Sequence, residues 1–314
     1  MSIRNATIRQ LQIFAAAART LSFARVAEQF RLTPGAISFQ IKQIEGLCGF
    51  PLFERVGRSV VLTDAGAALL DHATVILKEL NDADQQMEAL RGSTGGSVTL
   101  GLVSTAKYIV PHLLSRFQAE RPGVTITLQD GNRRKIHAAV IKGDVDIAIM
   151  GRPSAEVVES VAFANHPSTI IAAPNHPLTR GGRLRLHDLE SERFIVREEG
   201  SGTRALMDGF FRSQGLTPRI AMTTSSNEMI KQAVMAGIGI ALISRHTIQL
   251  ELGIGLLREL DIEGLPLMRA WYVVHRRSLP LLPVHSQFRQ FMQERGQSII
   301  DDLARRHTGR QPTA

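Results

Sequence analysis

Between residues 23 and 47 the chain starts one helix, stops it and starts another, and this break constrains the fold more than any other feature of the sequence. Apolar residues recur at helical spacing over 23–30. The run is interrupted at Leu32, and Pro34 restarts it, with Thr33 placed to cap the new helix. Two helices joined by so short a connection cross steeply and leave one face of the second helix free, which is typical of a helix-turn-helix.

The second helix has an apolar stripe over 37–47, so its other face points outward. On that face Lys42 can meet a phosphate or a guanine, and Phe39 can pack against a thymine methyl. Ser38 and the nearby Gln40 can form hydrogen bonds with base edges or phosphates. The alternative interpretation is an ordinary solvated helix face.

Arg55 and Arg58 flank Gly57 in the segment FERVGRSVVLT, which favours a short hairpin. Such a hairpin wing would meet the DNA backbone or the minor groove. Residues 1–63 hold eight Lys and Arg against three Asp and Glu, a net +5 of the whole chain's +8. Because a basic surface concentrated on a small unit is typical of nucleic-acid binding, we predict a winged helix-turn-helix DNA-binding domain.

Residues 64–91 contain no proline and carry apolar residues at mixed spacings of three and four, which predicts one long linker helix. At 1.5 Å per residue this helix is roughly 40 Å long, too long to bury its stripe on a small domain alone. We therefore expect it to pair with a second copy of the chain. A two-fold dimer presents two reading helices, so the expected partner is double-stranded DNA with an interrupted palindrome. Packing within its own chain is the alternative.

After a Gly and Ser hinge at 92–97, strands alternate with helices and a new α/β domain begins. Strands expected at 98–103, 124–129 and 145–150 alternate with helices expected at 107–120 and 133–142, and this alternation predicts a parallel sheet. A second α/β unit follows, and the chain then returns to the first through a strand and an amphipathic helix. We expect strands at 170–173, 194–196, 220–223, 238–243 and 267–275, and helices at 202–213, 228–236 and 283–295.

This pattern predicts a C-terminal effector domain of two lobes, at 98–303. Lobe I would contain 98–165 and 266–303, and lobe II 166–265. The polar tail at 304–314 is expected to be disordered.

Ligands of parallel α/β sheets bind beyond the carboxyl ends of the strands, where helix N-termini expose unpaired N–H groups. In this chain those ends carry mostly hydroxyl, amide and cationic side chains, which suit a carboxylate or a phosphate. Helix capping or surface solvation is the alternative for each residue taken alone. The predicted effector-binding residues are Ser104, Thr105, Lys107, Asn132, Arg152, Ser201, Thr203, Arg204 and Thr224.

Other classes of protein find little support. No H-E-x-x-H, zinc-type histidine spacing or G-x-S-x-G motif occurs, so we expect no enzyme, no metal and no cofactor apart from a small-molecule effector. No apolar run approaches about 18 residues, and the N-terminus lacks a secretory core, which indicates a cytoplasmic protein. Cys48 is the only cysteine and is expected to be a small buried hydrophobe, with redox sensing as the alternative. A solute-binding protein without DNA function would need a secretion signal.

The motifs AxxxxxSFxxVAxxFxLTPGAISxQIxxIE and PLFERxGRxVxLTDAG resemble those of the LysR-type transcriptional regulators. The resemblance covers the reading helix, the wing and the start of the next helix, and the rest of the chain has the family's length and layout. At Phe39 many members carry a polar or basic residue, so the preference for bases stays open. The resemblance implies DNA-contacting roles for Thr33, Pro34, Ser38, Lys42, Arg55 and Arg58.

The same resemblance implies lobes like those of periplasmic solute-binding proteins, a homodimer or homotetramer, and RNA polymerase as a further partner. The segments GLVSTAKY, DGNR and DIAIMGRP resemble the LysR-type subgroup that controls carbon-dioxide fixation (Calvin cycle, RuBisCO) operons. That subgroup implies a phosphorylated metabolite or NADPH as effector. A LysR-type regulator of another metabolic operon with a carboxylate effector is the alternative, and the sequence leaves activation or repression open.

Overall fold

The chain forms two compact units, Met1–Glu88 and Ala89–Ala314, which are described separately. None of the described helices combines the length and the apolar character needed to span a bilayer. The computed structural model describes residues 2–57, 59–91, 95–153, 157–278 and 281–307.

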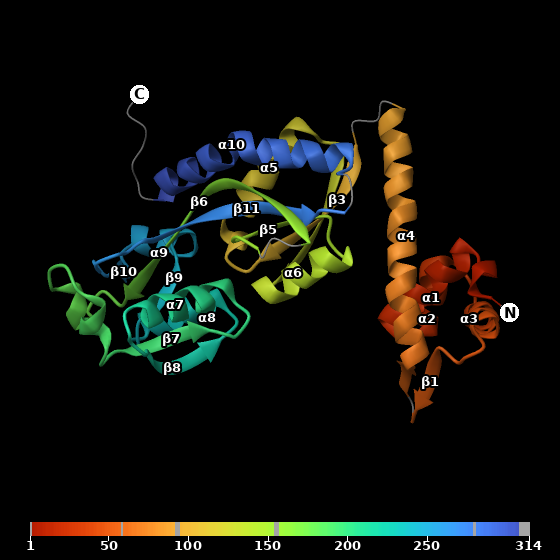
Figure 1. The fold of residues 1–314 in the computed structure, drawn as a ribbon, viewed down its shortest axis with the longest axis horizontal. Coiled ribbons are helices and arrows are strands. Elements are labelled where there is room, and N and C mark those ends of the chain that lie inside the picture. The colour runs from red at the N-terminus through yellow and green to blue at the C-terminus, as the bar shows by residue number, and fades with distance from the viewer. Residues whose placement is uncertain (1, 58, 92–94, 154–156, 279–280, 308–314) are drawn as a thin grey trace. The chain divides into compact units, whose positions relative to one another are not determined.

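Three helices form the core of the N-terminal unit (Figure 1). Each begins at a Ser or Thr cap, and Thr7 forms a complete capping box with Gln10. Phe14, Val26 and Ile37 are fully buried between the helices, and burial of such side chains is the main source of their stability. The helices are α1 (Ile8–Thr20), α2 (Phe23–Phe30) and α3 (Pro34–Cys48), preceded by a 3-10 turn at Ile3–Asn5.

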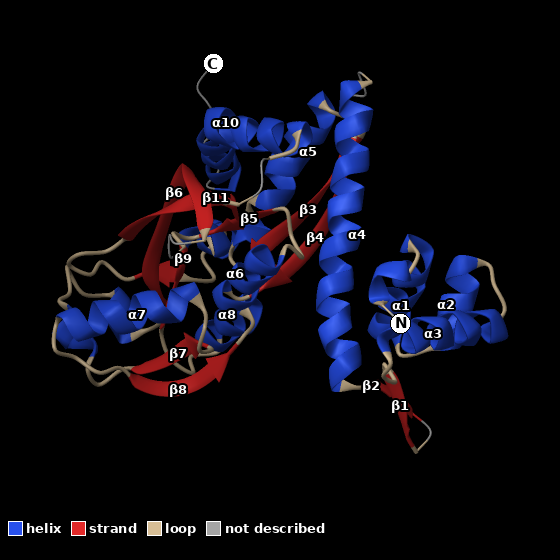
Figure 2. Ribbon diagram, turned by 45° about the vertical axis from the view of Figure 1, so that its right-hand side comes forward, coloured by secondary structure: helices blue, strands red, loops and turns tan. Residues whose placement is uncertain are grey.

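An antiparallel two-stranded wing follows α3 and leads into a long helix (Figure 2). The carboxylate of Glu45 accepts hydrogen bonds from the backbone N–H groups of Leu52 (2.8 Å) and Phe53 (3.4 Å), which ties the wing to α3. A Cβ added at Gly66 would lie 2.1 Å from the carbonyl oxygen of Leu52, so only glycine fits where the long helix starts. The elements are β1 (Phe53–Val56), β2 (Ser59–Leu62) and α4 (Asp64–Leu90).

Lobe I of the second unit has a parallel sheet in the strand order β4-β3-β5. Phe117 packs edge-on against Phe288 and Phe291, with ring centroids 5.1 and 5.3 Å apart, which fastens α5 to α10. The hinge predicted at 92–97 extends too far, because residues 96 and 97 already pair in β3. Residues 92–94 of this segment lie outside the described residues. The elements are β3 (Gly96–Val103), α5 (Val110–Glu120), β4 (Val124–Gly131), α6 (Arg133–Lys142), β5 (Ile147–Met150) and α10 (Pro283–His307), with a 3-10 turn at Ala106–Tyr108.

Helix α10 is longer than the sequence analysis predicted, which ended it at Arg295. Ile299, Ile300 and Leu303 are buried and continue its apolar stripe, so the packing extends the helix. The first residues of the predicted disordered tail, 304–307, are therefore helical, and 308–314 lie outside the described residues.

Two long antiparallel strands, β6 (Val158–Ala172) and β11 (Leu267–Arg276), run from lobe I into lobe II (Figure 1). The sequence pattern predicts only the end of β6, at 170–173. Residues 158–169 mix polar side chains and a proline with apolar ones, so no clean alternation marks them as a strand. The predicted lobe boundary at 165 consequently falls inside a strand.

Lobe II has a parallel pair of strands, β7 and β8, with Phe194 packed edge-on against Phe211 at 5.1 Å. The strand expected at 238–243 begins only at 241, because a turn with Gly237 at φ 76° precedes it. The elements are β7 (Arg193–Arg197), α7 (Gly202–Ser213), β8 (Arg219–Thr224), α8 (Asn227–Met235), β9 (Ala241–Ser244), α9 (Gln249–Gly253) and β10 (Arg258–Glu259), with 3-10 turns at Pro177–Thr179, Leu186–Leu189 and Arg245–Thr247.

Candidate functional site

The predicted DNA-reading surface lies on α3. Phe39 is 58% exposed and Lys42 is exposed, while Ser38 and Gln40 are half-buried. Ile41 and its neighbours on the opposite face are buried, so packing fixes which face of α3 is presented to solvent.

The residues at the start of α3 are engaged in forming the helix. The hydroxyl of Thr33 accepts a hydrogen bond from the backbone N–H of Ala36 (3.2 Å), and Pro34 is the first helical residue. On the wing, Arg55 is exposed and paired with Val60 across the hairpin. Arg58 lies outside the described residues. The DNA contacts of all these residues stay predictions.

The larger unit contains a cavity of about 250 Å³ between its two lobes. Five of the nine predicted effector-binding residues line it, and they lie after β3, after β5 and at the start of α7. These five residues are Ser104, Thr105, Arg152, Ser201 and Thr203.

The other predicted effector residues have partners elsewhere. Lys107 forms an ion pair with Asp130 at 2.6 Å, and both side chains are about half exposed. The side chain of Asn132 caps α6 by accepting a hydrogen bond from the backbone N–H of Lys135 (3.0 Å). Neither Lys107 nor Asn132 lines the cavity.

Thr224 and Arg204 also lie outside the cavity. The hydroxyl of Thr224 accepts from the backbone N–H of Ser226 (3.2 Å). Arg204 forms an ion pair with Asp208 at 2.9 Å, one helical turn away, and lines a neighbouring hollow. For these residues the capping or solvation alternative describes their observed contacts.

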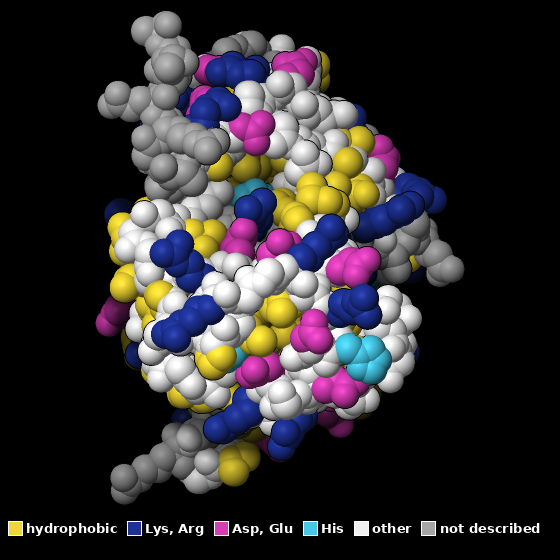
Figure 3. Space-filling view, turned by 90° about the vertical axis from the view of Figure 1, so that its left-hand side faces the viewer, with side chains coloured by type: hydrophobic (Ala, Val, Ile, Leu, Met, Phe, Trp, Pro, Cys, Tyr) yellow, Lys and Arg dark blue, Asp and Glu magenta, His cyan; other side chains and the backbone are white. Residues whose placement is uncertain are grey.

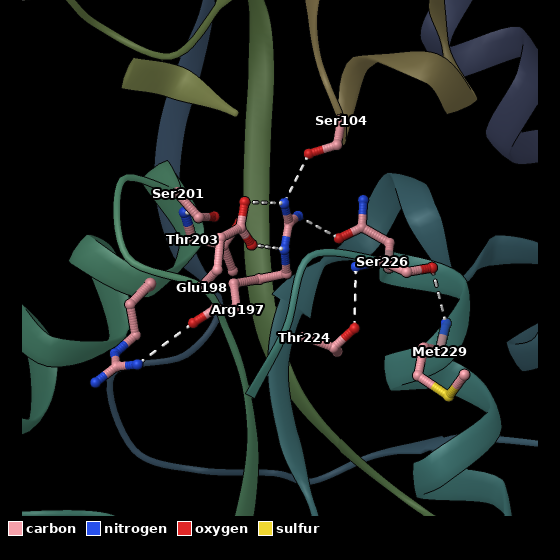
Figure 4. A network of polar contacts seen from close by, with 10 residues as sticks. Ser104, Arg197, Glu198, Ser201, Thr203, Thr224, Ser226 and Met229 are labelled. Carbon is pink, nitrogen blue, oxygen red and sulfur yellow. Dashed lines mark hydrogen bonds and ion pairs between the residues drawn. The ribbon is translucent and has the colours of Figure 1, made fainter. Parts of the chain in front are cut away.

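Arg197, at the end of β7, lines the cavity and was missed by the sequence analysis. It is 3% exposed and donates to the carboxylate of Glu198 (2.9 Å), to the amide oxygen of Asn227 (2.6 Å) and to the hydroxyl of Ser104 (2.9 Å) (Figure 4). Burial opposes ionisation of Glu198, but its hydrogen bonds and ion pair with Arg197 hold the net pKa of that carboxyl below its usual value. Since Ser104 belongs to lobe I, Arg197 links the two lobes.

Arg269, on β11, is a second missed residue. It donates to the hydroxyl of Ser168 (3.2 Å) and to the carbonyl of Gly202 (3.4 Å). Burial, and then repulsion from Arg133, lowers its pKa to about 10, so it stays charged at neutral pH. Arg133 donates to the carbonyl oxygen of Arg152 (3.0 Å). In the part of the chain that the structure describes, no carboxylate pairs with Arg133, Arg152 or Arg269, so the cavity carries excess positive charge.

His166, on β6, is a third missed residue. It is 2% exposed, its ring stacks on Trp271 with 3.7 Å between centroids, and its Nε2 lies 3.1 Å from the hydroxyl oxygen of Ser244. Trp271 in turn donates from its indole N–H to Nδ1 of His246 (3.1 Å). Burial lowers the pKa of His246 to about 4, so this imidazole is neutral at neutral pH.

A backbone hydrogen bond also joins the two lobes. The backbone N–H of Arg134, in α6, donates to the carbonyl of Gly200 (3.2 Å) in the loop before α7. Four arginines line this cavity beside the α7 N-terminus, and Arg197 alone of the four pairs with a carboxylate of the described residues, so this geometry is suited to holding an anion between two lobes.

The described residues contain no group of three or more His, Cys, Asp and Glu placed to hold a metal ion. Cys48 is free and half-buried, and burial, with a further contribution from Glu45, raises the pKa of its thiol. Less thiolate at neutral pH means lower reactivity, which favours the packing interpretation of Cys48.

On the face of the larger unit shown in Figure 3, basic and acidic side chains are interspersed with apolar ones. The net charge of +8 lies in this unit, because the +5 of residues 1–63 is offset by −5 over residues 64–88 of the N-terminal unit. On this face the positive charge is therefore not gathered into a single-sign surface of the kind that binds nucleic acid.

Two family models match this chain. The bacterial regulatory helix-turn-helix protein of the lysR family matches residues 8–67, and the LysR substrate binding domain matches residues 91–297. Together they cover the helix-turn-helix domain and both lobes of the larger unit.

Curated relatives agree over nearly the whole length. The regulator CbbR of Rhodospirillum rubrum is 49% identical over 88% of this chain and 92% of that protein, and CfxR of Cupriavidus necator is 42% identical over 99% and 97%. A RuBisCO operon transcriptional regulator of Allochromatium vinosum is 39% identical over 96% and 98%. The resemblance to regulators of RuBisCO operons is thereby confirmed.

Solved structures confirm the predicted fold. The regulatory domain of Synechocystis PCC6803 CcmR, in complex with 2-PG, has a TM-score of 0.61 at 32% identity, covering 64% of this chain and 96% of that one. Full-length CbnR complexed with its target DNA has a TM-score of 0.71 at 21% identity, covering 92% and 99%, and shows the fold alone. Sequence, fold and site therefore agree that the chain belongs to the LysR family of bacterial DNA-binding transcriptional regulators.

Proposed function

We propose that this regulator of carbon-dioxide fixation genes is controlled by a small anionic metabolite that binds in the cavity between its lobes. The observation that carries the proposal is the convergence of Arg133, Arg152 and Arg269 on one cavity with no carboxylate partner among the described residues. Guanidinium groups at a helix N-terminus bind phosphate or carboxylate. The similar regulatory domain of CcmR was solved in complex with 2-PG, which supports a small-molecule effector for this domain.

The size of the cavity favours a phosphorylated metabolite over NADPH. About 250 Å³ lies just below the usual range for small-molecule pockets and corresponds to roughly eight water molecules of about 30 Å³ each. A dinucleotide needs the cleft to open widely, whereas a compact phosphorylated acid needs only a small adjustment of the lobes.

Ligand binding would act through the contacts that join the lobes. A ligand can shift the protein only by as much as it prefers one arrangement over another. A preference of about 1–3 kcal/mol would change DNA affinity or bending roughly 5- to 150-fold. Arg197 is placed to transmit this preference, because it lines the cavity and bonds across the lobes to Ser104.

We further propose that the working form is a homodimer or homotetramer on an interrupted palindrome. Val75, Ile76 and Leu80 are exposed at 42–46% and lie within two turns of α4, and such a group of exposed apolar residues fits pairing with a second α4. RNA polymerase is the expected further partner, the cytoplasm is the expected location because the DNA is there, and no catalytic role is proposed.

The test is a titration of the purified full chain onto DNA from upstream of its own gene and the divergent neighbour, at fixed salt. It is run with and without sugar phosphates, phosphoenolpyruvate, 2-PG and NADPH. A footprint that changes with one of the phosphorylated acids supports the proposal. Specific DNA binding that no compound alters contradicts effector control by these compounds.

A further inference from the structure

Two nitrogen atoms in the wall of the cavity have no hydrogen-bond partner among the described residues: Nδ1 of His166 and Nε of Arg269. The two residues are directly opposite each other in the β6–β11 ladder, so their side chains lie on one face of the sheet, and both line the cavity. Buried polar groups in proteins are almost always hydrogen-bonded. This cross-strand pair therefore has unfilled hydrogen-bonding capacity at the place where a ligand is expected.

The ring of His166 is held in one orientation. Trp271 covers one of its faces, and Ser244 takes up Nε2, so Nδ1 is the nitrogen left for a ligand. Both unpartnered atoms are out of contact with solvent. A ligand thus reaches them only as the lobes adjust around it, and the bonds it forms favour the adjusted arrangement.

The surroundings of His166 are cationic. Burial first, and then Arg269 and His246, hold the pKa of His166 well below its usual value, so the imidazole is neutral beside these cations. The charged or titratable side chains around it are Arg269 on β11, then Arg133, Arg152, Arg197 and Glu198 about the cavity, and His246 with its neighbour Asp301.

We propose that His166 and Arg269 together bind a phosphate-type dianion of the effector, and that His166 takes up one proton from solvent as the dianion binds. The inference rests on the proposed function. A dianion turns the local field from repulsive to attractive for a proton. The imidazolium then donates from Nδ1 to the ligand and from Nε2 to Ser244, with its face against the Trp271 ring in a cation–π contact.

This chemistry distinguishes classes of effector. A monocarboxylate brings one negative charge to a site with three unpaired guanidinium groups, so it offsets little of the positive charge that opposes a proton on His166. A phosphate monoester brings about two. The site therefore selects phosphorylated compounds over simple carboxylic acids.

The probe is inorganic sulfate, because it stays a dianion over the whole working pH range and does not titrate itself. Calorimetry of sulfate binding to the wild-type full chain, in two buffers of different ionisation enthalpy near pH 7, should show net uptake of up to one proton. The Kd should rise between pH 6 and pH 8, by up to about tenfold per pH unit. Binding without proton uptake and with a pH-independent Kd overturns the inference and leaves the anion site standing.

His166→Gln should bind sulfate more weakly at pH 6 and remove the pH dependence. His137→Gln is the matched control: His137 borders the neighbouring hollow but not the cavity, so this variant should keep the wild-type pH profile. If the pH dependence of the Kd were unchanged in His166→Gln, or lost in His137→Gln, the proton would be taken up by a group other than His166, and the inference would be wrong. If neither sulfate nor any phosphorylated acid binds the wild type at all, the proposed function fails together with the inference.

Discussion

The predicted DNA-reading surface and the ligand cavity are built in opposite ways. The reading surface comes from one helix, α3, and the hairpin directly after it. The cavity takes its lining from segments spread from Val103 to Arg269. Helical periodicity alone decides which residues share the first surface, whereas the second exists only once β6 and β11 have paired. The comparison implies that substitutions on α3 act locally, while those in the cavity act through the whole two-lobed unit.

Arg269→Gln should have the largest effect, a loss of effector affinity without a loss of DNA affinity. It removes a half-buried guanidinium at the cavity wall, and hydrogen bonds to charged groups contribute about 1.5–3 kcal/mol, so the Kd for a phosphorylated effector should rise roughly 10- to 150-fold. DNA affinity without effector should stay at the wild-type value. Arg258→Gln, at an exposed position on β10, is the matched control for charge. If Arg269→Gln lost DNA affinity as much as effector affinity, the DNA-reading surface and the ligand cavity would not be separable.

Gly66→Ala tests whether a substitution in the N-terminal unit affects that unit alone. The added Cβ would lie 2.1 Å from a backbone oxygen, so the variant should lose about 1–3 kcal/mol of unfolding free energy, measured by urea denaturation. Gly46→Ala, in α3 with no atom within 4 Å of the new Cβ, should gain up to about 1 kcal/mol. Effector affinity should not change in either variant. Destabilisation of both by similar amounts would contradict the steric explanation.

Lys42→Ala should weaken DNA binding by about 1 kcal/mol and reduce the slope of log K against log salt by about one unit, if Lys42 meets a phosphate. Arg55→Ala on the wing should behave similarly. Lys142→Ala, an exposed lysine at the end of α6, should leave both quantities unchanged. An unaltered salt slope in Lys42→Ala would remove this lysine from the phosphate-contacting surface.

Glu198→Gln has the smallest expected effect. The pKa of Glu198 is held below its usual value, so the carboxylate stabilises the fold above its ordinary pKa of about 4.5, and this contribution is lost as pH falls through the depressed value. Wild type should exceed the variant in unfolding free energy by no more than about 1 kcal/mol at pH 7. The difference should vanish at strongly acidic pH, and a difference that grows on acidification would show that the sign is wrong.

Local signals explain what could be predicted. The helices at 133–142 and 202–213 begin and end where expected, because Asn132 and Ser201 are recognisable caps. Thr33 and Pro34 marked the start of α3 for the same reason.

Pairing of distant strands explains which residues of the cavity could not be predicted. Arg269 and His166 lie on strands that cross between the lobes, and no periodic pattern marked residues 158–169 as a strand. Arg197 directly follows the strand predicted at 194–196, so the rule that ligands bind at carboxyl strand ends could have included it. The same rule selected three residues that have other partners in the structure, namely Lys107, Arg204 and Thr224. Side chains near a helix start also form caps and ion pairs, so their position alone does not identify a ligand contact.

The central claim is that one small anion fills the cavity and thereby changes the complex with DNA. The most direct measurement is DNA affinity and bend angle for the full chain on its own upstream region, with the effector at a concentration that calorimetry shows to be saturating. We expect either a change in DNA affinity of at least fivefold or a change in bend angle of comparable free energy, and we expect Arg269→Gln to abolish it. Saturated binding that leaves affinity and bend angle both unaltered would contradict it.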